Sequence, residues 1–246
     1  MENVQIVILA AGKGKRMESE LPKVLAPLRG STMIKHIIDE VLEFTNTKPI
    51  VIVGHKKELV IEHLGETCVY AVQDEQLGTG HAVSCAKEKV ENAKHILVMS
   101  GDQPFIKKET LANLIKTHLE KNATITLGTT TLENFNNEYQ AFNFFGRIKR
   151  DENDKIIGIK EYKDANEEEK NIKEVNAGLY IFESDFLWHN LKKLRNENAQ
   201  GEYYLTDLLK IAKEENQKIE SINLSNTEAL GANTKQELET LEKLLD

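Results

Sequence analysis

Short apolar runs alternate with amphipathic segments through the first half of the chain. Residues 4–11 form an apolar run that a Gly-Lys-Gly turn ends, which predicts a buried strand and a loop. After Ser31 and Thr32, either of which can cap a helix, apolar residues recur with helical spacing over 33–42. Further strands are predicted at 50–53, 67–72 and 96–99, and further helices at about 56–64, 79–91 and 108–121. This βαβ rhythm predicts a mainly parallel α/β sheet, in which ligands bind beyond the carboxyl ends of the strands.

The pattern becomes richer in strands after residue 122. A polar stretch at 164–173 is predicted to be a surface loop, and no repeat or low-complexity tract interrupts the chain. One continuous domain with a β-rich lobe is therefore the simplest organisation. The elements predicted here are strands at about 124–130, 142–149, 156–160, 175–182 and 218–224, and helices at about 185–195, 203–215 and 234–245.

The composition is that of a globular protein and excludes several classes. The formal net charge is −8, so a general nucleic-acid-binding surface is not expected. Cys68 and Cys85 are the two cysteines, which leaves no disulfide framework and no thiolate zinc site. The first residues show neither a signal peptide nor a membrane span, so we expect a cytoplasmic protein without membrane contact.

The turn after the first predicted strand concentrates glycine and positive charge. Residues 9–17 read LAAGKGKRM, in which glycines let backbone N–H groups approach an anion and the cations neutralise it. Met17 replaces the third glycine of a dinucleotide fingerprint, and the Gly-Lys-Ser/Thr of a Walker loop is absent from the sequence. The alternative is an ordinary glycine turn with solvated lysines. Pro22-Lys23 favours a phosphate loop, because it directs another ammonium to the same strand end.

Two further loops carry candidate chemistry at the same sheet edge. Asp102 directly follows the strand predicted at 96–99, where a carboxylate beside a polyphosphate loop suits magnesium; a cap of the next turn or helix is the alternative. Residues 73–82 combine amide side chains with glycines, which can read the polar edge of a base. We interpret His81 in this stretch as helix packing rather than as a ligand. The chain contains no Asp-x-Asp, the metal motif of many glycosyltransferases.

Eight motifs occur in an order that identifies a family resemblance. Together they resemble the uridylyltransferase domain of the bifunctional N-acetylglucosamine-1-phosphate uridylyltransferase/glucosamine-1-phosphate acetyltransferases, over about residues 4 to 246. The first, second and fourth are shared by many sugar nucleotidyltransferases, whereas the others are more specific in combination. The motifs are LAAGKGKRM, PKVL, QDEQLGTGHA, GDQP, GRIKRDENDKIIGIKEYKDA, EVNAGLYIF, NAQGEYYLTDLL and ALGANTKQEL.

The resemblance implies a fold and an activity. The implied fold is a Rossmann-like nucleotidyltransferase fold, with a mixed, mainly parallel sheet flanked by helices and a β-rich sugar-binding lobe. Within one domain over 1–246, the implied parts are a nucleotide-binding half (about 1–122), a sugar-binding half (about 123–233) and a C-terminal helix (234–246). The implied reaction transfers UMP from UTP to N-acetyl-α-D-glucosamine 1-phosphate, with Mg²⁺, and yields UDP-N-acetylglucosamine and pyrophosphate.

The resemblance also implies roles for individual residues at the matching motif positions. The structural alternatives are a turn glycine at Gly146 and a strand-end cap at Asn176. The implied catalytic residues are Arg16, Lys23 and Asp102, and the implied metal ligands are Asp102 and Asn233. The implied nucleotide-binding residues are Leu9, Ala11, Gly12, Lys13, Gly14, Gln73, Gln76, Gly78 and Thr79, and the implied sugar-binding residues are Gly146, Glu161 and Asn176.

Several features depart from the family pattern. Lys15 replaces the usual threonine of the phosphate loop, and Ser100 and Gln103 are unusual neighbours of Asp102 that bear on sugar selectivity. The hexapeptide repeats of the family's acetyltransferase β-helix are not found in these 246 residues, so acetyl transfer is not expected. Because that β-helix builds the family's trimer, we expect a monomer or a weak oligomer.

Two other functions remain open from the sequence. A related nucleotidyltransferase could use another sugar 1-phosphate or another base, although the QLGTG loop favours uracil and the NAG and GEYYLTD motifs favour N-acetylglucosamine. A non-catalytic nucleotide-sugar sensor could keep the fold. The presence of Lys23, Asp102 and Asn233 together argues against a sensor. A protein that only binds a nucleotide sugar has less need of a pair of metal ligands and a cation.

Overall fold

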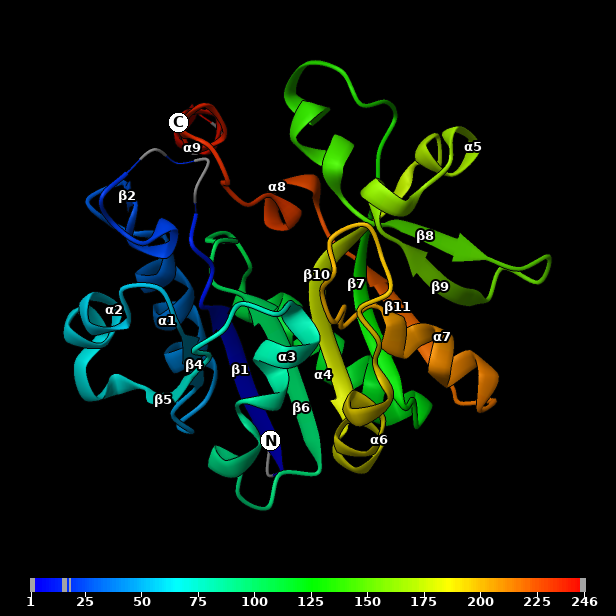
Figure 1. The fold of residues 1–246 in the computed structure, drawn as a ribbon, viewed down its shortest axis with the longest axis horizontal. Coiled ribbons are helices and arrows are strands. Elements are labelled where there is room, and N and C mark those ends of the chain that lie inside the picture. The colour runs from blue at the N-terminus through cyan, green and yellow to red at the C-terminus, as the bar shows by residue number, and fades with distance from the viewer. Residues whose placement is uncertain (1–2, 15–16, 18, 244–246) are drawn as a thin grey trace.

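The computed structural model of the protein describes residues 3–14, 17 and 19–243, and within them nine strands form one mixed sheet (Figure 1). A hairpin of β8 (Arg147–Arg150) and β9 (Ile156–Lys160) extends the sheet where β8 pairs with β10. A separate short pair joins β2 (Pro27–Leu28) to β3 (Ser31–Thr32). The main path runs in the order β11 (Ile219–Asn223), β7 (Ile125–Thr131), β10 (Glu174–Glu183), β6 (His95–Ser100), β1 (Val4–Ala10), β4 (Ile50–Val53) and β5 (Val69–Val72).

Strand β10 runs against every other strand of the main path. It pairs antiparallel with both β6 and β7, whereas β1 is parallel to β4 and β6, and β11 is parallel to β7. The start of β10 therefore lies at the edge where the other strands end, and Asn176 of β10 is paired with Thr129 near the end of β7. The predicted fold class, a mixed and mainly parallel sheet flanked by helices, is confirmed.

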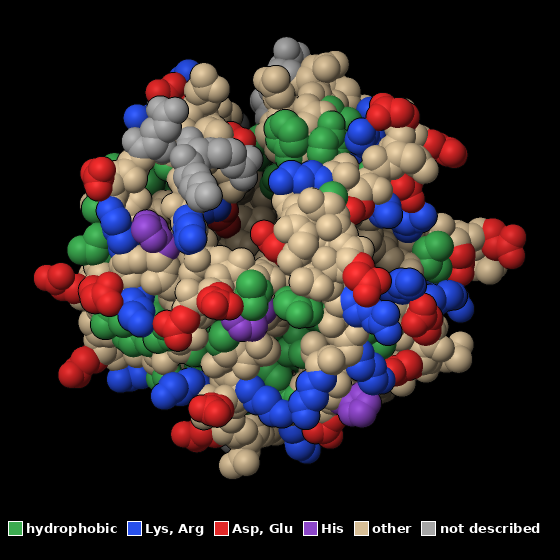
Figure 2. All heavy atoms as spheres, viewed as in Figure 1, with side chains coloured by type: hydrophobic (Ala, Val, Ile, Leu, Met, Phe, Trp, Pro, Cys, Tyr) green, Lys and Arg blue, Asp and Glu red, His purple; other side chains and the backbone are tan. Residues whose placement is uncertain are grey.

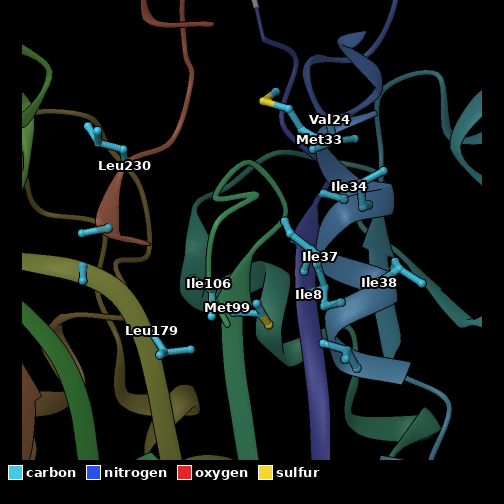
Figure 3. Packing of buried hydrophobic residues seen from close by; sticks show 14 of the residues in the cluster. Ile8, Val24, Met33, Ile34, Ile37, Ile38, Met99, Ile106, Leu179 and Leu230 are labelled. Carbon is cyan, nitrogen blue, oxygen red and sulfur yellow. The ribbon is translucent and has the colours of Figure 1, made fainter. Parts of the chain in front are cut away.

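Helices cover both faces of the sheet (Figure 1). Alternate strand residues face opposite layers, so Ile8 and Val7 of β1 are both fully buried, in two different hydrophobic clusters. Figure 3 shows Ile37 of α1 beside Ile8. The first layer contains α1 (Met33–Phe44), α2 (Lys57–Leu64) and α4 (Lys108–Lys121), and the second contains α3 (Thr79–Ser84), α6 (Ser184–Asn190) and α7 (Asp207–Glu214).

Three further α-helices belong to the described part of the chain. These are α5 (Glu167–Lys170), α8 (Asn226–Ala229) and α9 (Lys235–Lys243). Of the two candidate caps of α1, Thr32 is the N-cap, because its hydroxyl accepts a hydrogen bond from the Lys35 N–H. Helix α4 and strand β9 have the predicted bounds, and the last predicted helix is confirmed as far as Lys243.

Two predictions about the β-rich lobe are wrong. The strand predicted at 142–149 begins only at Arg147, because residues 137–144 form a 3₁₀ helix whose carbonyls turn inward to the Arg147 guanidinium. The loop predicted at 164–173 contains α5, which a capping box stabilises: Asn166 and Glu169 bond reciprocally to each other's backbone N–H.

Three helices on the second layer are shorter than predicted. Helix α3 ends at Ser84 and not at 91, because i→i−3 bonds such as Ala86 N–H to Val83 O tighten the chain towards a 3₁₀ turn. The segment predicted as a helix at 185–195 likewise passes from α6 into a 3₁₀ turn after Asn190. Helix α7 begins at Asp207 and not at 203, because the backbone of Tyr203 pairs with another loop.

Candidate active site

Two neighbouring pockets open at the edge of the sheet where β1 and β6 end. Figure 2 shows this face hollowed at that edge. Both pockets are lined by Ser100 and Asp102, so they adjoin at the end of β6. The strand-end pocket, of about 250 Å³, is lined by Leu9, Ala10, Ala11, Gly12, Lys23, Val24, Gln73, Gln76, Gly78, Thr79, Ala82, Ser100, Asp102 and Glu202. The lobe pocket, of about 340 Å³, is lined by Ser100, Asp102, Gln103, Ala141, Phe144, Phe145, Gly146, Glu161, Asn176, Ala177, Gly178, Gly231, Asn233 and Glu237.

The Lys23 ammonium contacts two side-chain oxygens where the two pockets meet. The Lys23 ammonium forms an ion pair with Asp102 and donates a hydrogen bond of 2.9 Å to Asn233 Oδ1. The side chains of Lys23 and Asp102 are 17% and 16% exposed, so this charge pair is largely shielded from solvent. Val24 and Leu25 are buried in the core and hold the short 3₁₀ helix from which Lys23 extends. The positive charge is therefore fixed at the junction.

The chain must come close to itself to build this junction. Gly14 has a φ of +55°, and a Cβ at this position would lie 2.7 Å from the Lys23 Cβ. A Cβ at Gly101 would lie 2.9 Å from the Leu9 carbonyl oxygen. Glycine at these two positions lets the loops after β1 and β6 converge on one point.

The loop over 77–80, which lines the strand-end pocket, is held in place by hydrogen bonds to a second segment of the chain. The Tyr203 N–H donates to the Leu77 carbonyl, and the Gly80 N–H donates to the Tyr203 carbonyl, both at 2.8 Å. Gly78 has a φ of +110°, and a Cβ there would lie 2.7 Å from the Tyr203 carbonyl oxygen. The Leu205 N–H also donates to the Thr79 hydroxyl. The loop over 77–80 is therefore held by the GEYYLTD motif.

The Gln73 amide, which His81 contacts, also holds the loop over 77–80. Gln73 is 3% exposed, and its Nε2 donates to the Gly78 carbonyl and lies 3.1 Å from His81 Nδ1. His81 thus orients a pocket amide, a contact that the interpretation as helix packing did not include. Within the described residues, the hydrogen bonds leave Gln73 Oε1 as the free acceptor of this amide.

The lobe pocket is lined by the half-buried carboxylate of Glu161. Thr206 donates a hydrogen bond of 2.8 Å to Glu161 Oε1. Burial raises the pKa of the Glu161 carboxyl above its ordinary value, and the nearby carboxylates of Asp207 and Asp164 raise it further. Gly146 leaves room beside this group, because a Cβ there would lie 2.7 Å from Ile159 and 3.5 Å from both Glu161 oxygens.

A fully buried arginine builds the side of the lobe pocket that carries Phe144 and Phe145. The guanidinium of Arg147 is 0% exposed and donates to four backbone carbonyls. It also lies 4.3 Å from the centre of the Phe135 ring, a cation–π contact. Burial lowers the pKa of Arg147. Phe144 at the mouth of the pocket is 62% exposed and contacts the edge of Tyr162. The carbonyl oxygens that Arg147 contacts are those of Phe142, Asn143, Phe145 and Lys170.

The donor set at the junction fits one kind of metal. Among the described residues, no three His, Cys, Asp or Glu side chains converge as a metal site. The Asp102 carboxylate and the Asn233 amide oxygen contact a single cation, the Lys23 ammonium. Two protein oxygens beside a phosphate-sized pocket match the way that Mg²⁺ is usually held, with substrate phosphates and waters supplying the remaining ligands.

Most of the predicted site residues lie in the two pockets. Arg16 lies outside the described residues, and Lys13 and Gly14 line neither pocket. Glu202 and Thr206 were missed as site residues, although both belong to the GEYYLTD motif that the sequence analysis singled out. The predicted residues that line the strand-end pocket are Leu9, Ala11, Gly12, Lys23, Gln73, Gln76, Gly78, Thr79 and Asp102, and those that line the lobe pocket are Asp102, Gly146, Glu161, Asn176 and Asn233.

Comparisons with known proteins find similar sequences over most of the chain. A family model described as a MobA-like NTP transferase domain matches residues 6–137. The bifunctional protein GlmU of Streptococcus agalactiae is 42% identical over 97% of this chain and 51% of its own length. GlmU of Enterococcus faecalis is 42% identical over 100% of this chain and 52% of its own length. The chain therefore spans about half the length of these curated relatives.

A solved structure shares the fold at low sequence identity. A Bacillus anthracis protein assigned as a glucose-1-phosphate thymidylyltransferase, solved with a bound sucrose, has a TM-score of 0.77. It is 22% identical in sequence, and the match covers 98% of this chain and 94% of the other.

Among the residues that the structure describes, none of the helices has the length and apolar character needed to cross a bilayer.

Proposed function

Because this chain belongs to the family of MobA-like NTP transferase domains, we propose that it transfers UMP from UTP to N-acetyl-α-D-glucosamine 1-phosphate. The products are UDP-N-acetylglucosamine and pyrophosphate. The observation that carries this proposal is the meeting of two pockets at Asp102, with the Lys23 ammonium fixed between Asp102 and Asn233. A two-substrate transfer needs one pocket for each substrate and positive charge at the point of contact.

The strand-end pocket suits the nucleotide. Its glycine-rich walls admit a planar base, and Gln73 Oε1 provides an acceptor that the N3–H of uracil can use. Lys23 lies on the side of the pocket that the triphosphate would face. The loop over 77–80 is clamped before any ligand binds, which lowers the entropic cost of ordering the base site.

The lobe pocket suits the sugar phosphate. The Glu161 carboxylate can accept hydrogen bonds from sugar hydroxyls, and Gly146 leaves the space beside it open. The exposed Phe144 ring provides an apolar surface at the entrance. Asn176, at the start of β10, lies across the pocket from the end of β6 because β10 runs antiparallel.

The reaction itself needs alignment and charge neutralisation rather than a protein nucleophile. A phosphate oxygen of the sugar 1-phosphate attacks the α-phosphorus of UTP in line and forms the new P–O bond. The bond from the α-phosphorus to its bridging oxygen breaks, and pyrophosphate leaves with the electron pair. Two like unit charges 4 Å apart repel by about 4 kcal/mol at an effective dielectric of 20, so the approach needs cations.

Asp102 and Asn233 would hold Mg²⁺ in this site, and the metal would supply charge neutralisation of the phosphates when bound. Lys23 neutralises phosphate charge from the same junction. Arg16 is proposed to add a further cation, and Lys13 and Gly14 are proposed to contact the phosphates from the loop after β1.

The proposal is tested by magnesium-dependent pyrophosphate release. The protein is incubated with UTP and Mg²⁺, with and without N-acetylglucosamine 1-phosphate, and in parallel with other nucleotides and other sugar phosphates. Release that requires UTP and N-acetylglucosamine 1-phosphate together supports the proposal. Preference for another pair would assign a different nucleotidyltransferase, and binding of UDP-N-acetylglucosamine without turnover would assign a sensor.

A further inference from the structure

Gln103 carries a buried acceptor with no donor. It lies in the loop after β6, lines the lobe pocket and is 5% exposed. Its Nε2 donates to the Ala177 carbonyl at 2.6 Å and to the Ala229 carbonyl at 3.0 Å. Its Oε1 is buried and, within the described residues, accepts no hydrogen bond. Buried polar atoms are nearly always paired, so an unpaired one beside a pocket points to a missing partner.

The orientation of this amide is determined by its neighbours. Two carbonyl oxygens lie against one end of the Gln103 side chain, so that end must be the NH₂ group. A flipped amide would bring three oxygens together without a hydrogen atom between them. Oε1 is therefore an acceptor only, and its partner must be a donor.

A glycine leaves space in front of this oxygen. Gly178 lies in the irregular part of β10 with a φ of +72°. A Cβ at Gly178 would lie 3.4 Å from Gln103 Oε1 and 3.6 Å from Ser100 Oγ. All three residues line the lobe pocket. A small donor group that enters beside Gly178 would therefore come within reach of both Oε1 and the Ser100 hydroxyl.

We propose that Gln103 Oε1 is a specificity-determining acceptor for a donor group on the sugar ring, either a hydroxyl or the acetamido N–H. This inference rests on the proposed function, which assigns the sugar phosphate to the lobe pocket. The sugar contacts that the resemblance implies do not include Gln103. A sugar without the matching donor leaves the oxygen buried and unpaired, so the site discriminates against that sugar.

The test pairs one variant with a set of sugar analogues. Gln103→Met keeps the length of the side chain and removes both the Nε2 donor and the Oε1 acceptor. The substrates are N-acetylglucosamine 1-phosphate, its 3-, 4- and 6-deoxy analogues, and 2-deoxyglucose 1-phosphate, which carries no donor at C2. The values of KM and kcat are measured for each substrate at saturating UTP.

The proposal predicts a loss of discrimination confined to one analogue. In the natural protein, one analogue should show a KM at least about tenfold above that of the parent sugar. In Gln103→Met, this ratio should fall to within about twofold while the ratios for the other analogues stay unchanged. The analogue affected tells whether the donor is a hydroxyl or the acetamido N–H. A uniform rise in KM for all sugars would overturn the proposal and leave Gln103 a purely structural role.

Asn190 offers a matched control for the loss of a buried amide. It is 1% exposed on α6, its Oδ1 is also unpartnered within the described chain, and it lines neither pocket. Asn190→Leu should leave every analogue ratio unchanged. If Gln103→Met does not fold, a crystal structure of the natural protein with the sugar 1-phosphate decides. A sugar donor within about 3.2 Å of Oε1 supports the proposal, and a bound sugar with no atom within 4 Å overturns it.

The proposed function can fail separately. If the natural protein releases no pyrophosphate with any sugar 1-phosphate, the proposed transfer is wrong, whatever Gln103 does. If it turns over N-acetylglucosamine 1-phosphate with unchanged analogue ratios in Gln103→Met, only the inference about Gln103 is wrong.

Discussion

The ammonium of Lys23 lies 2.9 Å from Oδ1 of Asn233 and is ion-paired with Asp102. A protein cation thus contacts the two side-chain oxygens that are the proposed ligands of a metal ion. Three distant parts of the sequence supply this arrangement: the loop after β1, the loop after β6 and the segment before α9. The proposed reacting centre is therefore assembled by the topology of the sheet and not by one local motif.

Removal of the Lys23 ammonium should slow the transfer. By comparison with single electrostatic contacts in other active sites, Lys23→Ala should lower kcat about 10²- to 10³-fold, because phosphate charge is left uncompensated. Initial rates of pyrophosphate release measure the effect. Lys35→Ala, which breaks an exposed pair with Asp39, serves as the control. A decrease below about threefold in Lys23→Ala would contradict the assigned role.

Neutralising the Asp102 carboxylate should abolish magnesium-dependent turnover. Asp102→Asn keeps the shape of the side chain but removes the charge that a hard divalent cation prefers. Activity should fall by about 100-fold or more at equal magnesium, and a magnesium titration should not restore it fully. If the variant follows the magnesium curve of the natural protein, the metal is held elsewhere.

A methyl group on Gly78 should disturb the nucleotide site selectively. In Gly78→Ala, the new Cβ would meet the Tyr203 carbonyl oxygen, and the φ of +110° disfavours any L side chain. The KM for UTP should rise about tenfold or more while the KM for the sugar phosphate changes less. Gly30→Ala is the matched control, because Gly30 also has a positive φ but no atom within 4 Å of the Cβ position. Equal effects of the two substitutions on the KM for UTP would contradict the clamp.

Loss of the buried Arg147 guanidinium should destabilise the β-rich lobe. Arg147→Met leaves four carbonyl oxygens without their donors and should lower the free energy of unfolding by about 2–4 kcal/mol. Denaturant unfolding measures this loss, and the KM for the sugar phosphate should rise more than that for UTP. Arg195→Met tests a surface arginine, whose side chain is 78% exposed, and should change stability little. A change in unfolding free energy below about 0.5 kcal/mol in Arg147→Met would show that the carbonyls find other partners.

Stability should decrease in mild acid because of His118. Burial, and then the neighbouring His95, lower the pKa of His118 from 6.5 to about 4. The folded state keeps this ring neutral while the unfolded chain binds a proton, so stability is full above pH 6.5 and falls as pH drops towards 4. Burial also lowers the pKa of His95, with Glu183 opposing and Lys94 adding to that change.

The pH effect of His118 can be isolated by a variant. Between pH 7 and pH 5, the unfolding free energy should fall by about 2 kcal/mol more in the natural protein than in His118→Gln. Urea unfolding at both pH values measures the difference. Parallel pH curves for the two proteins would show that His118 binds its proton equally well in both states.

Local pattern was sufficient for much of the first half of the fold. The helical spacing of Met33 to Leu42 and the apolar run after Asn3 are governed by near neighbours in sequence, so α1 and β1 could be predicted. The position of Asp102 followed too, because a residue directly after a buried parallel strand must lie at the ligand-binding edge.

The features that local pattern could not predict depend on distant contacts. The direction of β10 is determined by its pairing with β6 and β7. The apolar pattern of a strand does not show whether it pairs parallel or antiparallel with its neighbours. The 3₁₀ helix at 137–144 contacts the Arg147 guanidinium, which the Lys170 carbonyl, 23 residues further along, also holds. The pairing of Tyr203 with the loop over 77–80, which delays the start of α7, links segments more than 120 residues apart.

The hydrogen-bonded sheet from β5 to β11, with its register shift in β10 between Asn176 and Tyr180, has a mechanical consequence. Strands on both sides of the junction belong to one sheet, so a hinge rotation that separated the two pockets would have to break or distort backbone pairs. The distance between the two proposed substrate pockets is then determined by the pairing of the strands. In the proposed transfer, the loops and side chains at the rim would admit the substrates and release pyrophosphate.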